Sequence, residues 1–382
     1  MISSKAKEVK PFIVMDVMAK ADELEKKGES VIHLEVGEPD FDTPEVIQQA
    51  AVEAINSGKT KYTLAMGLME LREAICDYYY REYHVVISPD QIIVTSGTSP
   101  ALLFMMLAIL EEGDEVIISN PHYACYPNFI RSVGGNPVEV RTYPEDGFQY
   151  RPEAIRKALS DRTQGIVINS PSNPTGIVMS DRNLEEIAGF TKQYVISDEI
   201  YHGLVYEGRA RSILEFTKNA FVINGFSKLY AMTGWRLGYL IFPKEFTSVM
   251  RRINQNFSIS ANSFVQWAGI AALQSAAPDV ERMKTVYNER RVYMLQRLQE
   301  IGLKIHHQPT GAFYIFADAR SFCSDSYAEA FRIIEEVKVG VTPGIDFGSG
   351  GEGFLRFSYA TSMENIREGL NRIEDYFKKK KS

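Results

Sequence analysis

The sequence of 382 residues predicts an α/β protein, in which a large and mostly parallel sheet is flanked by helices and joined to a smaller α/β domain. The chain is longer than one typical hydrophobic core accommodates, which predicts two domains. Apolar residues make up 45% and charged residues 24%, as in ordinary globular proteins. Strand-like and helix-like segments alternate through most of the chain. This alternation is typical of a parallel sheet covered by helices.

The elements of the large domain follow one another in a regular order. A helix is expected at Met15–Lys27, before the main sheet. A short buried strand is expected at Gln91–Thr95, and an all-apolar, buried helix follows at Ala101–Leu110. The remaining strands of the large sheet are expected at Glu115–Ser119, Gly165–Asn169, Tyr194–Ser197, Ala220–Asn224 and Tyr239–Phe242.

A change of composition after about Glu281 marks the second domain. A long, charged amphipathic helix begins there, and shorter strands are expected at Ala312–Phe316 and Phe354–Ser358. The opening helix needs a surface to pack on, so the N-terminal segment is assigned to the same domain. We therefore expect a large domain over residues 41–280 and a small domain made of residues 1–40 with 281–382.

Charge and cysteine content exclude several classes of protein. A net charge of −7 argues against a broad nucleic-acid interface, which needs a basic face. The three cysteines lie far apart, so neither a disulfide framework nor a zinc site is indicated. No apolar run approaches the length of about 18 residues that a membrane span needs, and the N-terminus lacks a signal-peptide core. A cytoplasmic protein without nucleic-acid, membrane or metal partners is expected.

Four polar segments follow predicted strands, where ligands gather in open α/β sheets. The first is SGTSP, residues 96–100, which precedes the apolar helix. Gly97 lets the backbone approach a ligand closely, and the free N–H groups of the helix start suit a phosphate. An ordinary capped helix is the alternative interpretation of this segment taken alone.

The second and third segments carry amide and carboxylate groups. NSPSNPTG, residues 169–176, is a turn whose asparagines either shape the chain or hydrogen-bond a ligand. In SDEIY, residues 197–201, Asp198 either caps a helix or holds a protonated ring nitrogen, with Tyr201 one helical turn further on. Neither segment is specific by itself.

The fourth segment contains a lysine among apolar residues. Lys228 lies in NGFSKLYAMTGWRLGY, residues 224–239. Burial of an unpaired ammonium is costly, whereas a lysine that loses its charge by desolvation or by forming an imine is a nucleophile. A structural ion pair is the alternative. Arg236, in the same segment, offers a guanidinium fork suited to phosphate.

Together the four segments resemble the signature of fold-type-I pyridoxal-phosphate-dependent aminotransferases of class I/II. The order NPTG, SDEIY and SKxxxMTGWRxGY is highly specific, and the resemblance extends from VGEPDF at residues 36–41 to RFSYA at residues 356–360. It therefore covers nearly the whole chain. The fold-type-I architecture and pyridoxal 5'-phosphate as cofactor are what the resemblance implies.

The resemblance implies roles at the ring of the cofactor. Lys228 corresponds to the lysine that carries the cofactor as a Schiff base and, once released, moves the substrate proton. Asp198 corresponds to the partner of the pyridinium nitrogen, which keeps the ring an electron sink. Asn173 and Tyr201 correspond to the groups that hydrogen-bond the phenolic oxygen, and Tyr123 to the aromatic residue that stacks on the ring.

The phosphate and the substrate are assigned in the same way. The resemblance implies phosphate contacts from these residues: Gly97, Thr98, Ser99 and Arg236. Tyr62 resembles a tyrosine that reaches the phosphate of the neighbouring subunit, so a homodimer is implied. Arg356 resembles the arginine that binds the substrate α-carboxylate, assisted by Gly37 and Asn173.

One position departs from the family pattern. Many members have a serine three residues before the lysine that contacts the phosphate, whereas this chain has Gly225. Ser227 is adjacent to the lysine and is kept as a candidate contact.

The expected reaction is a transamination, in which an amino acid donates its amino group to the cofactor and a 2-oxo acid collects it. The alternative on the same fold is a lyase acting at Cβ, such as a carbon–sulfur lyase, because both reactions begin by removing the Cα proton. A non-catalytic module that binds the cofactor is a further alternative. The apolar helix at Ala101–Leu110 has no Lys or Arg for a second substrate carboxylate, which favours neutral or aromatic amino acids.

Overall fold

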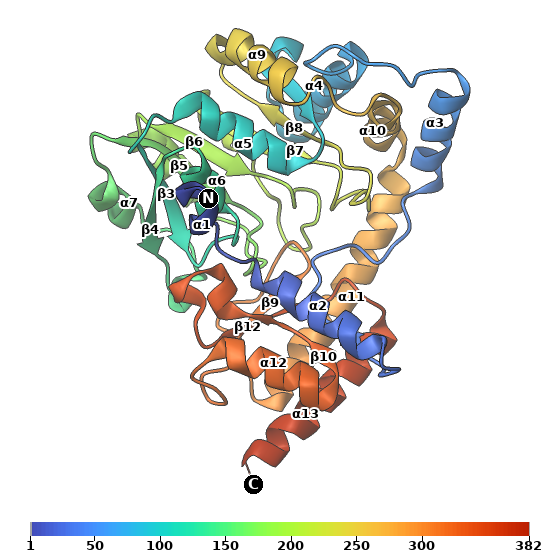
Figure 1. Ribbon diagram of the computed structural model, residues 1–382, viewed down its shortest axis with the longest axis vertical. Helices are drawn as coiled ribbons and strands as arrows, with labels where there is room; N and C mark the ends of the chain where they lie inside the picture. Colours follow the sequence, from blue (N-terminus) through green and yellow to red (C-terminus); the bar gives the residue numbers. More distant parts are fainter. Residues whose placement is uncertain (1, 382) are drawn as a thin grey trace.

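Seven strands form the central sheet of the computed structural model, which describes residues 2–381 (Figure 1). Their spatial order is β2-β8-β7-β6-β5-β3-β4. The strands from β3 to β7 run parallel, and β8 runs antiparallel to both of its neighbours. Their bounds are β2 Ile92–Thr95, β3 Glu115–Asn120, β4 Asn136–Arg141, β5 Thr163–Asn169, β6 Tyr194–Asp198, β7 Ala220–Gly225 and β8 Gly238–Ile241. The mostly parallel sheet expected from the sequence is confirmed.

Both faces of this sheet are buried under helices. Successive side chains of each strand point to opposite faces, so each strand contributes to a core on either side. In β5, Ile166 and Ile168 pack into one core cluster and Val167 into the other. One face is covered by α5 Thr98–Ile109, α6 Tyr126–Ser132 and α9 Thr247–Phe257. The other face is covered by α4 Met69–Tyr83, α7 Pro152–Ala158, α8 Asp181–Phe190 and α10 Ser263–Ser275, with α3 Glu45–Asn56 against α10.

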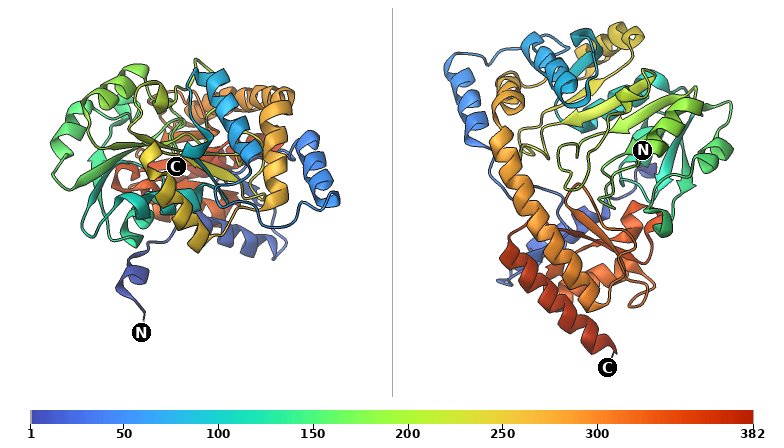
Figure 2. Two further views of the ribbon diagram at one scale, coloured as in Figure 1. Left: turned by 90° about the horizontal axis from the view of Figure 1, so that it is seen from above. Right: turned by 180° about the vertical axis from the view of Figure 1, so that it is seen from behind.

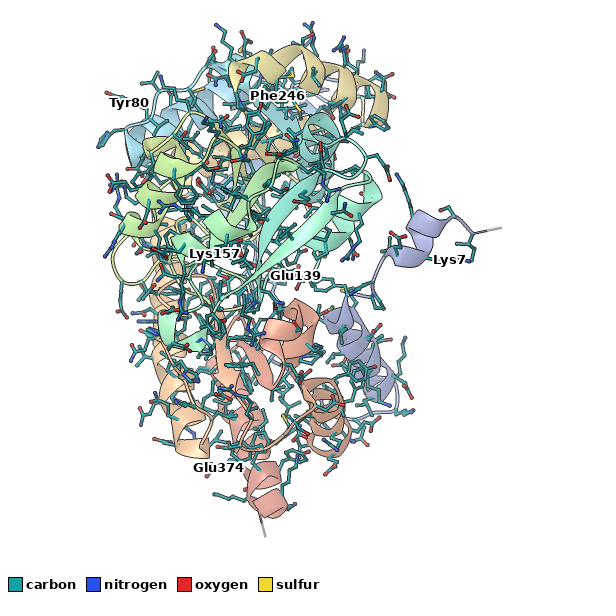
Figure 3. All side chains as sticks on the ribbon, turned by 90° about the vertical axis from the view of Figure 1, so that its left-hand side faces the viewer. Lys7, Tyr80, Glu139, Lys157, Phe246 and Glu374 are labelled. Carbon is teal, nitrogen blue, oxygen red and sulfur yellow. The ribbon has the colours of Figure 1, made fainter. Side chains whose placement is uncertain are left out.

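The edge strand β4 was not expected from the sequence. Its segment reads NPVEVR, and Val140 is its only fully buried side chain. Proline is tolerated at a sheet edge, where one side of the strand has no ladder partner. Figure 3 looks onto this side of the molecule, where Glu139 of β4 and Lys157 of α7 point outward.

A second, smaller group of elements lies below the main sheet in Figure 1. Helix α11, Ala277–Ile301, leads to an antiparallel sheet in the order β11-β12-β9. The bounds of this group are β9 Tyr314–Asp318, β11 Thr342–Pro343, β12 Phe354–Ser358, α12 Ser326–Val337 and α13 Met363–Lys381. The long helix and the two predicted strands of this part are confirmed, with β9 displaced by two residues.

The N-terminal segment packs on this second group, as Figure 2 shows from above and from behind. Strand β1, Ile32–His33, pairs in parallel with β10, Val339–Gly340. Helix α2, Ile13–Glu25, buries Val17, Ala21 and Leu24 against Ile334 of α12. The short helix α1, Ser4–Glu8, contacts α6 of the other group.

Over residues 2–381, none of the helices is both long enough and apolar enough to cross a membrane. In the same part of the chain, His, Cys, Asp and Glu side chains form no group of three that could hold a metal ion.

Candidate active site

A cavity of about 340 Å³ opens beyond the carboxyl ends of the central strands. Its wall combines residues that follow β2, β5, β6 and β7 with residues of β9, β12 and α2. The sequence-predicted residues that line it are Gly37, Thr98, Ser99, Tyr123, Asn173, Asp198, Tyr201, Ser227, Lys228, Arg236 and Arg356. Four segments that are far apart in the sequence thus meet in one place.

One end of the cavity has the features of an anion site. Gly97, at φ 92°, immediately precedes α5, whose first N–H groups at Thr98 and Ser99 lack partners within the helix. A Cβ added to Gly97 would lie 2.6 Å from Nη2 of Arg236, so the guanidinium packs directly on this turn. Arg236 itself adopts a left-handed φ of 56°. Such strain in a non-glycine residue is typical of functional sites.

Asp198 ends β6 with its carboxylate in the cavity wall. The hydroxyl of Tyr126 donates to its Oδ2 at 2.7 Å, and the backbone N–H of Ile200 donates to its Oδ1 at 3.2 Å. Burial raises the pKa of Asp198 to about 6, while these two donors act in the opposite direction. The carboxylate is therefore fixed in place and still mostly ionised at neutral pH.

The role of Tyr126 was not found from the sequence. It lies three residues after Tyr123, close to the start of α6, and the two rings pack edge to face. The contact joins positions 72 residues apart in the chain. The available signal was the spacing of two aromatic residues in PHYACYP, residues 121–127.

Lys228 follows β7 and reaches across the cavity. Its Nζ donates to the carbonyl oxygen of Gly37 at 2.6 Å. Burial lowers its pKa to about 8, with a smaller lowering from the nearby Arg356 and Arg236. An amine with this pKa is partly neutral at neutral pH, which is the nucleophilic form.

Arg356, on β12, is almost fully buried beside Asn173. Its Nη1 donates to Oδ1 of Asn173 at 2.8 Å, and its Nη2 donates to the carbonyl oxygen of Glu35 at 2.6 Å. Its Nε, also buried, has no hydrogen-bond partner within residues 2–381. A buried guanidinium with an unused donor is suited to a carboxylate ligand.

Tyr201 and Tyr314 meet at their hydroxyl groups, 2.8 Å apart. Tyr314 belongs to β9, and a Cβ added to Gly37 would lie 2.1 Å from its hydroxyl oxygen. Tyr314 was predicted only as part of a strand. Its place in the site depends on how the second group of elements docks on the first.

Two predicted cofactor contacts lie outside the cavity wall. Gly97 is covered by the guanidinium of Arg236, and Tyr62 is 82% exposed.

Gly225, where the family often has serine, has little room for a side chain. An added Cβ would lie 3.0 Å from the carbonyl oxygen of Leu237. Ser227 does line the cavity.

Part of the lining that was not predicted comes from the N-terminal segment, which contributes Phe12, Val14, Met15 and Met18. The sequence predicted a helix here and assigned it only a packing role. A second row of apolar residues spaced by three, Phe12, Met15 and Met18, is the sequence pattern that indicates this further role.

Comparison with known proteins identifies the family of this chain. Residues 29–373 match the family described as "Aminotransferase class I and II". The (5-formylfuran-3-yl)methyl phosphate transaminase of Methanocaldococcus jannaschii is 43% identical, over 99% of this chain and all of its own length. The aspartate/prephenate aminotransferase of Thermus thermophilus is 40% identical, over 97% of each chain.

Solved structures of similar proteins superpose closely on this chain. A Methanococcus jannaschii protein, described as similar in its active site to kynurenine aminotransferases, superposes with a TM-score of 0.93 at 42% identity. That comparison covers 99% of this chain and 100% of the other. Thermus thermophilus aspartate aminotransferase with maleate gives a TM-score of 0.94 at 40% identity, covering 98% and 99%.

These relatives carry aminotransferase or transaminase names, so the findings favour transamination and not the lyase alternative. The chain belongs to the class I and II aminotransferase family and is a pyridoxal-phosphate-dependent aminotransferase.

Proposed function

We propose that this aminotransferase moves an amino group from an amino acid to a 2-oxo acid in two half-reactions at the cavity around Lys228. The observation that carries the proposal is the convergence of Lys228, Asp198 and Arg356 on one cavity wall. A nucleophilic amine, a buried carboxylate and a buried guanidinium are the three groups that this chemistry requires of the protein.

The residues present fit the cofactor. The anion site at Gly97 and Arg236 suits a phosphate, and the carboxylate of Asp198 suits a protonated ring nitrogen. When bound, pyridoxal phosphate supplies an electron sink for the negative charge that develops at the substrate Cα. Thr98, Ser99 and Ser227 are proposed as further phosphate contacts, and Tyr123 as the stacking residue.

The remaining groups orient the substrate and move its proton. Arg356 binds the α-carboxylate with its fork, and Asn173 holds the guanidinium in position. Lys228 attaches the cofactor and, once free, accepts the Cα proton at Nζ, because its lowered pKa keeps part of the amine neutral. Asn173 and Tyr201 are proposed to hydrogen-bond the phenolic oxygen of the cofactor.

Borohydride reduction of the holoenzyme, followed by peptide mapping, tests the attachment site. We expect one modified lysine, Lys228, and no modification in a Lys228→Ala variant. Modification of any other lysine would overturn the assignment. Release of ammonia and pyruvate from cysteine, without a 2-oxo acid, would instead indicate a lyase.

A homodimer is also proposed, with Tyr62 reaching the phosphate of the neighbouring subunit. Tyr62 lies outside the cavity of its own chain, and Leu64 beside it is 69% exposed. Large apolar side chains left exposed close together on a chain favour a protein contact.

The location and the domain division remain proposals as well. Cys76, Cys125 and Cys323 are free thiols, as a reducing cytoplasm keeps them.

We propose a large domain over residues 41–280 and a small domain of residues 1–40 with 281–382. The separate sheets, and the pairing of β1 with β10, support this division.

A further inference from the structure

Resting on the proposed pairing of Asp198 with the cofactor, we propose that the neighbouring Glu199 is a positioning residue for the reaction. Its carboxylate does not line the cavity. It fastens the turn that carries Asp198 and Tyr201, residues 198–202, to α4 on the opposite face of the central sheet. This contact fixes where those two side chains meet the cofactor.

The two neighbouring carboxylates point to opposite faces of the sheet, as successive side chains of an extended strand do. Asp198 accepts from Tyr126 of α6. Glu199 instead accepts from Tyr79 of α4. Its backbone N–H also continues the ladder of the sheet by donating to the carbonyl oxygen of Ile223 in β7 at 2.8 Å. A displacement of Glu199 therefore displaces Asp198, because the two residues share one peptide unit.

Four donors surround the carboxylate of Glu199. Its Oε1 accepts from the hydroxyl of Ser197 at 3.1 Å, the hydroxyl of Ser212 at 3.0 Å and the backbone N–H of Ile213 at 3.1 Å. Its Oε2 accepts from the hydroxyl of Tyr79 at 3.2 Å. Burial raises the pKa of Glu199 to about 7, and the four donors act in the opposite direction. The carboxylate thus joins β6, α4 and the loop before β7 at one point.

Helix α4 holds the same turn at a second point. Tyr83 comes four residues after Tyr79 and so lies on the same side of the helix. Its hydroxyl is 2.9 Å from Nδ1 of His202, which directly follows Tyr201 in the chain. Burial lowers the pKa of His202 to about 3, so the ring is neutral. Contacts from one helix therefore reach the turn at Glu199 and at His202, on either side of Tyr201.

A packing role alone does not require a carboxylate at this position. Glu199, Tyr79 and His202 are all buried. Burial of a carboxylate costs free energy, and an apolar side chain of similar volume would fill such a core at lower cost. The carboxylate adds direction, because an acceptor with several fixed donors specifies the placement of its own backbone. Groups that act on a ligand must be held within about 0.5 Å of their productive positions.

Affinity for pyridoxal phosphate and the visible circular dichroism of the bound cofactor test the proposal. Glu199→Ala is expected to weaken cofactor binding roughly tenfold or more and to change the circular dichroism, because Asp198 moves relative to the ring. Glu199→Gln keeps an acceptor for Ser197, Ser212 and Ile213, so it should recover most of the affinity. Unchanged affinity and circular dichroism in Glu199→Ala would overturn the proposal.

Glu329→Ala is the matched control. Glu329, in α12, is also buried, and it accepts from the hydroxyl of Tyr376 at 3.1 Å and from Nζ of Lys380 at 2.7 Å, away from the cavity wall. Its removal should lower stability toward urea and leave cofactor affinity and circular dichroism unchanged. Equal losses of affinity in the two variants would attribute the effect of Glu199 to general destabilisation and contradict the proposal.

A milder double variant covers the case in which Glu199→Ala does not fold. Tyr79→Phe with Ser212→Ala removes one donor from each carboxylate oxygen and leaves Glu199 in place. Cofactor affinity is expected to fall roughly threefold, with a change in the circular dichroism. If this variant folded and bound the cofactor like the unmodified enzyme, Glu199 would not be a positioning residue.

Asp198→Ala separates this proposal from the function on which it rests. It should weaken cofactor binding at least as much as Glu199→Ala. If Asp198→Ala bound the cofactor as tightly as the unmodified enzyme, the proposed pairing of Asp198 would fail, and Glu199 would have no such group to position. If Asp198→Ala weakened binding and Glu199→Ala did not, the proposal for Glu199 alone would fail.

Discussion

Tyr126 and Asp198 illustrate how one hydrogen bond sets the charge of a buried group. Both side chains are buried, and the tyrosine hydroxyl donates to the ionised form of the carboxylate. A donor to a charged acceptor contributes about 1.5–3 kcal/mol, which corresponds to one pKa unit or more. If Asp198 pairs with the ring nitrogen of the cofactor as proposed, the affinity of the apoenzyme for pyridoxal phosphate should depend on Tyr126 through this hydrogen bond.

Tyr126→Phe is expected to weaken cofactor binding on the acid side of neutrality. Loss of the donor should raise the pKa of Asp198 above its present value of about 6, so the carboxylate, which is proposed to bind the cofactor in its ionised form, is protonated at higher pH. The pH below which the apoenzyme loses its affinity for the cofactor should rise by roughly one unit. Absorbance titrations of the apoenzyme between pH 5 and pH 8 measure this shift.

Tyr150→Phe is the matched control. Tyr150 is also buried, and its hydroxyl donates to the carbonyl oxygen of Val167 at 2.9 Å, away from the cavity wall. Its loss should reduce stability by a comparable amount and leave the pH dependence of cofactor affinity unchanged. A shift of the same size in both variants would argue against a specific role for Tyr126.

Residues in specific motifs could be predicted from the sequence, whereas their partners could not. Lys228, Asp198 and Arg236 lie in segments whose order is specific, and the structure brings them to one cavity. Their individual roles stay predictions. Tyr126 and Tyr314 were missed because their contacts join distant positions, and no local pattern marks such a contact.

Among the elements, strands buried on both faces were predicted and marginal strands were not. A strand such as β7, with every residue buried, contains a continuous apolar run over residues 220–223. The edge strand β4 is half-exposed, and β1, β10 and β11 have two residues each, which is too short to produce a periodic pattern. These short pairings depend on docking between segments and not on local propensity.

The start of α2 is expected to loosen when its distant cap is removed. Asp346→Ala deletes the acceptor for the N–H groups of Ile13 and Val14, a capping contact that contributes about 0.5–2 kcal/mol. Hydrogen exchange at these amides should accelerate by roughly tenfold. Mass spectrometry of the N-terminal peptide measures the change.

Asp325→Ala tests whether that effect is local. Asp325 caps α12 by accepting from the backbone N–H of Ala328 at 2.9 Å. Its removal should accelerate exchange at the start of α12 and leave the start of α2 protected. Faster exchange of α2 in both variants would point to general destabilisation.

The pairing of β1 carries a pH-dependent contribution to stability. Nδ1 of His33 lies 2.7 Å from Oε1 of the buried Glu35, and this hydrogen bond raises the pKa of His33 to about 9. Because the folded pKa lies above the ordinary value of about 6.5, the stabilisation is complete below pH 6.5 and is lost as the pH rises through 9. His33→Gln should therefore be less stable than the unmodified protein at pH 6, with a smaller difference at pH 9.5.

Urea unfolding at the two pH values measures this difference. In a Glu35→Gln background, the His33→Gln substitution should lose most of its pH dependence, since only the longer contact of His33 Nε2 with Oε1 of Glu25, at 3.3 Å, remains to hold the proton. A pH-dependent difference that stays undiminished without Glu35 would assign the effect to another group.

At the scale of the whole molecule, a hybrid of two variant chains tests the proposed dimer. Lys228→Ala removes the proposed attachment site, and Tyr62→Ala removes the proposed contact to the neighbouring phosphate. In a hybrid dimer, one site combines an intact Lys228 with an intact Tyr62 from the other chain. Mixing the variants after reversible unfolding should therefore restore cofactor affinity at one site per dimer, as absorbance titration would measure.

The arrangement within one chain predicts a different result. If Tyr62 served the cavity of its own subunit, every hybrid site would lack one of the two residues. Mixing the two variants would then restore no affinity for the cofactor. Analytical ultracentrifugation of the mixture checks that dimers have formed.

The anchoring of α2 by Asp346 also has a consequence for the biosynthesis of the protein. The two partners are 333 residues apart, and Arg356 reaches the carbonyl oxygen of Glu35 across 321 residues. Translation proceeds from the N-terminus, so the strands of the central sheet leave the ribosome before either late partner exists. The apolar residues of α2 must wait unpaired during this time. The enzyme can therefore assemble its reactive centre only at the end of synthesis, and truncated chains that lack the last segment cannot close it.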